Sequence, residues 1–355
     1  MIQPFVLDTR IPRVVFGAGT LASLAAEIEN LGVSSPVLVT TGRGARVFAE
    51  ATAGTKLPPA GVFDRAVMHT PVEITAEALD FARAVKADGV VSFGGGSAIG
   101  LGKMLRLRLK LPHLVIPTTY SGSEMTAVVG ETADGRKRTM RDPAILPDTV
   151  IYDVDRTRDL PVPTSVTSAM NAIAHAVEAM YAQNGNPLIS TVGEAAIQAL
   201  VAALPQIAAD PSGSEGRAGA LYGAWLCGVC LNAAGMALHH KLCHELGGSF
   251  GLPHAETHTI VLPHALAYNA PAIPEAYARM QRAVGDASPQ RRLFELANVE
   301  GVPRSLRALG MPQDGIAQTV ERVLKEPYWN PRPLEAAPLR ELLSRAWEGA
   351  APLPL

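Results

Sequence analysis

Hydrophobic positions follow two different patterns in the two halves of the chain. Up to about Asp155, short apolar runs alternate with stretches whose apolar residues recur at helical spacing. Because strands that alternate with helices usually form a parallel sheet covered by helices, we expect a Rossmann-like α/β domain over residues 1–157. The apolar runs predict strands at Val14–Gly17, Val37–Thr41, Ala60–Val67, Gly89–Phe93, His113–Thr119 and Val150–Asp155.

Beyond Asp155 only the helical pattern continues, and breakers such as Asn186-Pro187 and Asp210-Pro211 separate its segments. We therefore expect an all-helical domain over residues 158–355 that carries the substrate-binding and catalytic groups. The predicted helices are Thr164–Gln183, Leu188–Ala208, Ser214–Ala234, Met236–Gly247, His258–Asn269, Glu275–Val284, Gln290–Ala297, Arg304–Leu309, Ile316–Lys325 and Leu334–Trp347.

Composition narrows the class of protein. The 355 residues carry a formal net charge of −2, with 48% hydrophobic and 18% charged residues, as in ordinary globular proteins. No long run of like charges is present, which argues against nucleic acid as a partner. We find no apolar run of membrane-spanning length and no signal peptide at the N-terminus, so we expect a cytoplasmic protein without a membrane partner.

The three cysteines argue against a disulfide framework. Cys227 and Cys230 form a C-x2-C pair, a spacing known from zinc and redox sites. The pair lies inside an apolar helical run without a second cysteine pair, which favours buried, inert thiols. Cys243 lies in a histidine-rich helix, on a different face from the neighbouring His240 and His244.

Six of the nine histidines lie between Gly235 and His264. His240 and His244 are four residues apart, so both point from one face of a helix. We expect the glycines at 247 and 248 to end that helix, and a new turn to present His254.

A second pair with the same spacing, Asn171 and His175, lies upstream. Side chains from two helices and a loop can converge on a metal ion or an anionic substrate. The alternative is that the histidines are scattered core or capping residues.

A glycine-rich loop follows the predicted strand Gly89–Phe93. Glycines between a strand and a helix let phosphate oxygens approach backbone N–H groups at the helix N-terminus. The spacing matches neither the dinucleotide fingerprint nor a Walker loop. The alternative interpretation, a tight turn that serves only packing, is therefore retained. The candidate cofactor-binding residues in this loop are Gly94, Gly95, Gly96 and Ser97.

Two further loops follow strands at the same expected edge of the sheet, where ligands bind in such folds. Their candidate cofactor-binding residues are Thr40, Thr41, Thr118, Thr119 and Ser123, and Tyr120 can cover a nicotinamide. No acidic residue follows the second strand to hold a ribose 2′-hydroxyl, and Arg43 can meet a 2′-phosphate. The choice between NADH and NADPH stays open, with a lean toward NADPH or use of both.

Five segments together carry a resemblance that covers nearly the whole chain: GGGSAIGLGK, PTTYSGSEMT, MNAIAHAVEAMY, HHKLCHELGG and EPYWNPRP. They resemble the iron-containing alcohol dehydrogenase superfamily, which has a dehydroquinate synthase-like fold, and are most similar to its maleylacetate reductase branch. The resemblance implies reduction of maleylacetate, a small dicarboxylate, to 3-oxoadipate with NADH or NADPH during the breakdown of aromatic compounds. It also implies a homodimer and a basic residue, Lys137, near the nicotinamide.

The superfamily binds Fe(II) or Zn(II) through one aspartate and three histidines, and the aspartate position is Asn171 here. An amide oxygen is a poorer ligand than a carboxylate for such ions. The resemblance to the maleylacetate reductase branch, whose members are generally described as working without metal, therefore implies that no metal is required. If a metal is bound, the resemblance implies His175, His240 and His254 as its ligands.

The implied reaction adds hydride to an alkene conjugated with a ketone, so that an enolate forms and is then protonated. An enolate oxygen needs a hydrogen-bonding or positively charged partner. We expect His240 and His244 to be catalytic, and the expected substrate-binding residues are Asn171, His175, His254, Tyr120 and Lys241. The competing hypotheses are a metal-dependent alcohol or aldehyde dehydrogenase, a lyase or cyclase on the same fold, and a non-catalytic binding protein.

Overall fold

The computed structural model describes residues 4–354 except 54–58, 69, 134–135 and 327. Contacts divide the chain into two compact units, and each is described by itself. One unit is Arg10–Leu160, and the other is Pro161–Leu355 together with the described residues before Arg10. The sequence analysis drew the boundary after residue 157 and placed the first residues in the α/β domain.

The first unit contains a six-stranded sheet in the order β1-β8-β5-β4-β2-β3, and every strand pairing in it is parallel. The predicted parallel α/β architecture is therefore confirmed. The parallel arrangement brings the carboxyl ends of the strands to one edge of the sheet. The strands are β1 (Arg13–Gly17), β2 (Pro36–Val39), β3 (Gly61–Phe63), β4 (Gly89–Gly94), β5 (His113–Pro117) and β8 (Thr149–Asp153).

Helices cover both faces of this sheet, which explains why its strands read as continuous apolar runs. In β2, Leu38 belongs to the apolar cluster on one face, while Val37 and Val39 belong to the cluster on the other. The helical segments of this unit are η1 (Thr20–Ser23), α1 (Leu24–Asn30), α2 (Gly42–Ala51), α3 (Val72–Ala84), α4 (Gly96–Leu109), η2 (Ser123–Met125), η3 (Pro143–Ile145) and η4 (Val154–Thr157).

An antiparallel hairpin in the first unit was missed by the sequence analysis. It pairs β6 (Val128–Ala133) with β7 (Arg136–Arg141). Charged and polar residues take up much of both strands, so neither strand reads as an apolar run. Among the described residues, the hairpin forms a two-stranded sheet separate from the main sheet, with an isolated bridge between Thr132 and Pro71.

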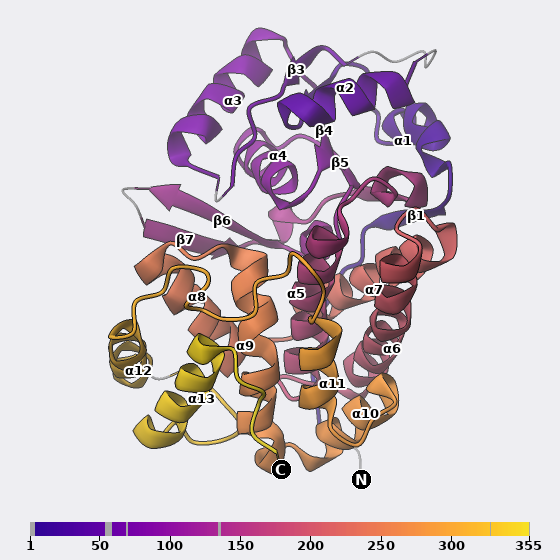
Figure 1. The fold of residues 1–355 in the computed structure, drawn as a ribbon. Helices are drawn as coiled ribbons and strands as arrows, with labels where there is room; N and C mark the ends of the chain where they lie inside the picture. Colours follow the sequence, from indigo (N-terminus) through magenta and orange to yellow (C-terminus); the bar gives the residue numbers. More distant parts are fainter. Residues whose placement is uncertain (1–3, 54–58, 69, 134–135, 327, 355) are drawn as a thin grey trace. The chain divides into compact units, whose positions relative to one another are not determined.

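The second unit is helical throughout its regular structure, as predicted. Figure 1 shows α5 between α9 on one side and α6 and α7 on the other. The helix α5 packs against all three of these helices. The helices are α5 (Val162–Met180), α6 (Pro187–Ala209), α7 (Ser214–Ala233), α8 (Leu238–Phe250), α9 (His254–Asn269), η5 (Ala270–Ala272), α10 (Pro274–Val284), α11 (Pro289–Leu296), α12 (Gly315–Lys325) and α13 (Ala336–Glu348).

Two helix predictions in this unit are wrong. The segment Arg304–Leu309 forms turns, and the N–H of Leu306 donates to the carbonyl of Ala346 instead of to a local helical partner. The helix α8 does not end at residues 247 and 248 but continues to Phe250, where Gly251 adopts the left-handed conformation with φ 64°. Glycine weakens a helix without ending it, and the left-handed cap decides where α8 stops.

The expectation that no apolar segment reaches membrane-spanning length is also corrected. By length and composition, α6 is apolar enough to cross a membrane. The bent pair of α7 and α8 passes the same test as one broken span. In this structure α6 packs against α5, α7 and α10, as a core helix does.

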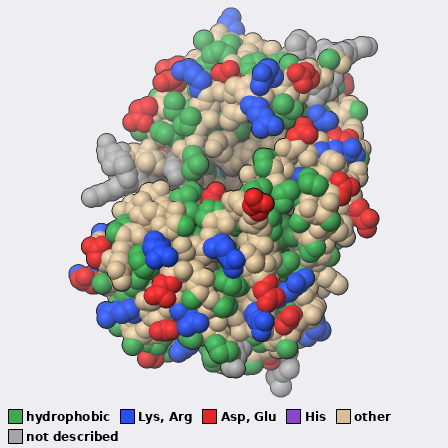
Figure 2. All heavy atoms as spheres, in the orientation of Figure 1, with side chains coloured by type: hydrophobic (Ala, Val, Ile, Leu, Met, Phe, Trp, Pro, Cys, Tyr) green, Lys and Arg blue, Asp and Glu red, His purple; other side chains and the backbone are tan. Residues whose placement is uncertain are grey.

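On the face drawn in Figure 2, acidic and basic side chains are interspersed, in keeping with the net charge of −2.

Candidate active site

The glycine-rich loop lies at the carboxyl edge of the sheet, where β2, β4 and β5 end side by side. The backbone N–H of Thr118 donates to the carbonyl of Gly94 at 3.0 Å. The hydroxyl of Thr40 donates to the carbonyl of Phe93 at 2.7 Å. These bonds bring the three predicted cofactor loops together at one edge, which is where ligands bind in open α/β sheets.

Glycine is needed in this loop for space and conformation. Gly94 has a φ of 144°, a backbone conformation that favours glycine. A Cβ on Gly95 would lie 2.9 Å from the Thr119 methyl group. A Cβ on Gly96, the first residue of α4, would meet no atom within 4 Å. The N-terminus of α4 is therefore open to a phosphate group beside Gly96 and the partly buried Ser97.

The side chain of Lys103 connects two of these loops, and the sequence analysis missed it. Lys103 lies on α4, is completely buried, and donates to the carbonyls of Ser123 and Val128 and to the Thr126 hydroxyl. Burial lowers the pKa of Lys103 to about 7, against the opposing charge of Glu124. A lysine within a run of small and apolar residues was the available signal, because a buried ammonium needs acceptors.

The remaining predicted cofactor residues have different surroundings. Thr41 is exposed, and its hydroxyl accepts from the N–H of Gly44 at 3.2 Å, which caps α2. Ser123 is partly buried and gives its carbonyl to Lys103. Tyr120 is fully buried. Lys137 belongs to β7 by its backbone, and its side chain lies outside the described residues.

In the second unit, the histidines of three helices form one continuous cluster. His240 is its centre, with ring centroids 5.1 Å from His175, 4.9 Å from His258 and 6.1 Å from His244. His254 adjoins His258 with centroids 4.2 Å apart. The cluster runs from the exposed His244 to fully buried rings, and it brings His175 of the upstream pair next to His240. Its members are His175 of α5, His239, His240 and His244 of α8, and His254 and His258 of α9, while Asn171 lies four residues before His175 on α5.

Glu178 is the main residue that the sequence analysis missed in this cluster. Its carboxylate accepts from the backbone N–H groups of Ala237 at 2.9 Å and His239 at 2.7 Å, at the N-terminus of α8. It also accepts from Nδ1 of His240 at 2.7 Å. Burial raises its pKa, but the hydrogen bond and charge of His240 outweigh burial and bring the pKa of Glu178 to about 2. Glu178 is therefore ionised and fixes the proton of His240 on Nδ1.

The signal for Glu178 was present in the sequence. It lies three residues after His175 on α5, which is otherwise apolar along this stretch. A carboxylate on the buried face of an apolar helix must find hydrogen-bond donors, and those donors mark a site.

Burial favours the neutral form of three rings in the cluster, those of His175, His239 and His258. Burial, followed by the positive charge of neighbouring histidines, holds the pKa of His175 and of His258 well below the usual value. Burial likewise lowers the pKa of His239 to about 3. Among the described residues, no hydrogen-bond partner meets Nε2 of His240, Nδ1 of His175 or the amide oxygen of Asn171. These atoms can bind a polar ligand without breaking an existing hydrogen bond.

Lys241, which was predicted to bind substrate, and Arg332, a second basic residue of this unit, both have partners within the protein. Lys241 forms ion pairs with Glu245 at 3.3 Å and Glu326 at 3.1 Å. Arg332 donates to the carbonyl of Tyr268 and lies over its ring at 4.3 Å. Both arrangements are structural, and a role for Lys241 in binding substrate stays a prediction.

The expected metal ligands do not form a metal site in this structure. Within the described part of the chain, one group of histidine, cysteine, aspartate and glutamate side chains brings three ligand atoms within 4.8 Å of one another. That group is His239, Cys243 and His258, and it excludes His175, His240 and His254. With the neutral amide of Asn171 as the remaining donor, this set is a poorer ligand set for the ion of the superfamily than one with a carboxylate.

Comparison with family models decides the class of protein. Residues 12–154 match the family described as iron-containing alcohol dehydrogenase, and residues 165–347 match the C-terminal domain of the same family. The chain belongs to the iron-containing alcohol dehydrogenase family. Members of this family are oxidoreductases, and the chain is one as well.

Within this iron-containing alcohol dehydrogenase family, the chain is similar over its whole length to maleylacetate reductases. It is 50% identical over 350 residues to the one from Sphingobium indicum, covering 98% of this chain and 99% of that relative. The crystal structure of maleylacetate reductase from Agrobacterium tumefaciens has a TM-score of 0.94 and 47% identity, covering 99% and 100% of the two chains. The predicted family and fold are confirmed.

A more distant member shows how widely the fold extends. The sulfoacetaldehyde reductase from Bifidobacterium kashiwanohense, solved in complex with NAD+, has a TM-score of 0.85 at 20% identity, covering 97% of this chain and 99% of that chain. At this identity the likeness shows the fold alone.

Proposed function

We propose that this chain reduces the carbon–carbon double bond of maleylacetate to give 3-oxoadipate, with NADH or NADPH, in the breakdown of aromatic compounds. The observation that carries the proposal is 50% identity to a maleylacetate reductase over nearly the full length of both proteins. The contacts of the nucleotide loops and of the histidine cluster support the following proposed roles for their residues.

The first unit binds the nicotinamide nucleotide. The N-terminus of α4 faces open space at Gly96 and holds the pyrophosphate, and Thr118 and Thr119 lie beside it. Lys103 keeps the Ser123 loop in place through its three acceptors. When bound, NADH or NADPH supplies the hydride that adds to the alkene carbon β to the ketone.

The second unit supplies the hydrogen-bonding and acid groups. In its protonated form His240 donates its Nε2–H to the enolate oxygen, and the carboxylate of Glu178, which accepts a hydrogen bond from Nδ1, stabilises the positive charge of the ring. His244 is exposed and adjoins His240, so it can exchange protons with solvent and protonate the α-carbon. Asn171, His175 and His254 bind the carboxylates of the substrate.

The proposed reaction requires no metal. Asn171 replaces the aspartate of the superfamily pattern, and the histidines of that pattern do not gather their ligand atoms at one point. We also propose that the protein is a homodimer, as the family resemblance implies, and that it is cytoplasmic. Size-exclusion chromatography with light scattering checks the oligomeric state.

The test is oxidation of NADH and of NADPH with freshly prepared maleylacetate, before and after dialysis against EDTA. We expect nucleotide oxidation that depends on maleylacetate and survives dialysis, with one mole of 3-oxoadipate formed per mole of nucleotide. Absence of turnover with maleylacetate would remove the proposed activity. Loss of turnover on dialysis, restored by Fe(II) or Zn(II), would instead support a metal-dependent dehydrogenase.

A further inference from the structure

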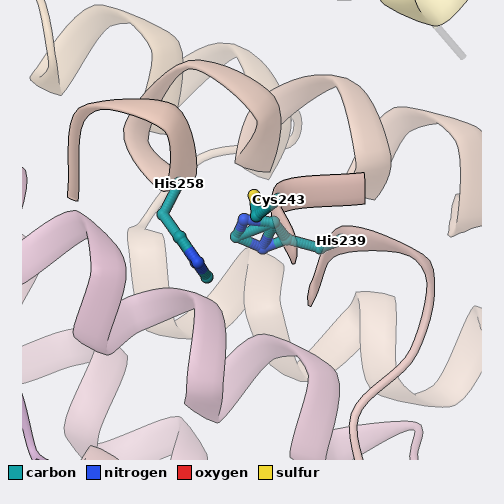
Figure 3. A group of neighbouring side chains, drawn as sticks. All are labelled: His239, Cys243 and His258. Carbon is teal, nitrogen blue, oxygen red and sulfur yellow. The ribbon is translucent and has the colours of Figure 1, made fainter. Parts of the chain in front are cut away.

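A group of three side chains beside the proposed catalytic histidines has no role in the reaction described above. It consists of His239 and Cys243 on α8 and His258 on α9. Their ligand atoms all lie within 4.8 Å of one another, and Figure 3 shows His239 and Cys243 together, facing His258. The group shares no residue with the metal ligand positions of the superfamily.

These side chains are buried without the hydrogen bonds that buried polar groups normally make. His239 and His258 are 0% exposed and Cys243 is 3% exposed. Both ring nitrogens of both histidines lack a hydrogen-bond partner among the described residues. Since most buried polar atoms in proteins are paired, four unpaired nitrogens on two rings, each ring with one nitrogen near the Cys243 sulfur, require an explanation.

We propose that His239, Cys243 and His258 form a binding site for a borderline-soft d-block cation of the Zn²⁺ class. One imidazole nitrogen from each histidine and the Cys243 sulfur are the ligand types that such cations prefer. The spacing of His239 and Cys243 by four residues places both on one face of α8. In a tetrahedral zinc site, neighbouring ligand atoms lie roughly 3.3–3.6 Å apart, so a shift of about 1 Å brings these three atoms to that spacing and leaves the fourth position for a small ligand such as water.

The charges of this region suit a divalent cation. Binding replaces the S–H bond of Cys243 with a sulfur–metal bond, and the thiol proton passes to the buffer. The thiolate contributes one negative charge, and the ionised Glu178, which accepts from the N–H of His239, contributes a second. These two negative charges oppose the two positive charges of the cation.

Other cysteines do not offer the same site. Cys227 and Cys230 are buried on α7, and neither belongs to a group of converging metal-ligand atoms among the described residues. Cys243 alone among the free cysteines combines with two histidines. This difference provides a matched control.

The test uses Co²⁺ as the spectroscopic probe on the full-length protein, first stripped with a chelator and kept free of oxygen. A cobalt–thiolate bond gives a charge-transfer absorption band that nitrogen and oxygen ligands do not give. We expect one equivalent of Co²⁺ to produce this band and Zn²⁺ to abolish it by displacement. The superfamily positions offer only nitrogen and oxygen donors, so cobalt bound there lacks the band.

Substitutions test which residues bind the cobalt ion that gives this band. Cys243→Ala and His258→Gln should each lose it, and the Cys227→Ala, Cys230→Ala double variant should keep it. Zn²⁺ should raise the Tm of the wild type and leave that of Cys243→Ala unchanged. Cobalt binding without a thiolate band in the wild type, or a band that persists in Cys243→Ala, would overturn the proposal. The wild-type measurement decides this even where a variant fails to fold.

Discussion

The carboxylate of Glu178 on α5 lies 2.7 Å from Nδ1 of His240 on α8. The same carboxylate accepts hydrogen bonds from the backbone N–H groups of Ala237 and His239 at the start of α8. One side chain therefore fixes both the position of the helix and the protonated nitrogen of its central imidazole. This arrangement leaves Nε2 of His240 as the atom that faces a ligand.

Replacing Glu178 should impair catalysis through His240. Glu178→Gln keeps the shape of the side chain but removes the charge that stabilises a protonated His240. We expect kcat to fall roughly 10- to 100-fold, the usual scale for a lost partner of an imidazole. The pH dependence of kcat should also change, which a purely structural role would not cause. Glu194→Gln is the control, because Glu194 pairs with Arg279 and Arg282 on a different helix; an equal fall there would contradict the role of Glu178.

Acid should remove a stabilising contribution of Glu178. Its pKa is about 2 in the folded protein and near 4.5 without these partners. Between these values the unfolded chain binds more protons, so stability rises with pH. The contribution, about 3 kcal/mol, is complete above pH 4.5 and is lost as the pH falls toward 2. Urea unfolding should show the stability difference between wild type and Glu178→Gln shrinking over this range; a difference independent of pH would contradict it.

The two predicted catalytic histidines should matter for turnover more than for folding. His240→Ala and His244→Ala should each lower kcat by roughly 10²-fold or more, the scale of a lost acid or oxyanion partner. The Tm of His244→Ala should stay near that of the wild type, because His244 is exposed.

His264 is the matched control for these variants. It is buried against Phe294, and burial lowers its pKa to about 4. His264→Gln should lower the Tm and leave kcat of the folded fraction nearly unchanged. If His240→Ala and His244→Ala also lose only stability, their catalytic assignment is wrong.

Side chains at Gly96 should block the nucleotide without disturbing the fold. A Cβ there meets no protein atom within 4 Å, so both Gly96→Ala and Gly96→Val should fold with a near-normal Tm. Each should raise the Kd for NADH or NADPH, the valine more than the alanine, because the side chain occupies the approach to the N–H groups of α4. Fluorescence titration measures the Kd, and unchanged binding in Gly96→Val would remove the phosphate-loop assignment.

The sequence by itself determined the parts of this protein that depend on neighbours in the chain. The alternation of apolar runs and helical periods identified the parallel sheet, because the central strands are buried on both faces. The spacing of His240 and His244 placed them on one helix face, and the glycines after β4 identified the open helix N-terminus. Each of these signals lies within about ten residues.

Only the tertiary structure decided which distant side chains meet. Glu178 reaches His240 across 62 positions, and Lys103 reaches Val128 across 25. His239 and His258 join Cys243 through the packing of α8 on α9, which no spacing in the sequence encodes. The physical reason is that burial obliges these polar groups to find partners, while the fold alone determines which partners are within reach.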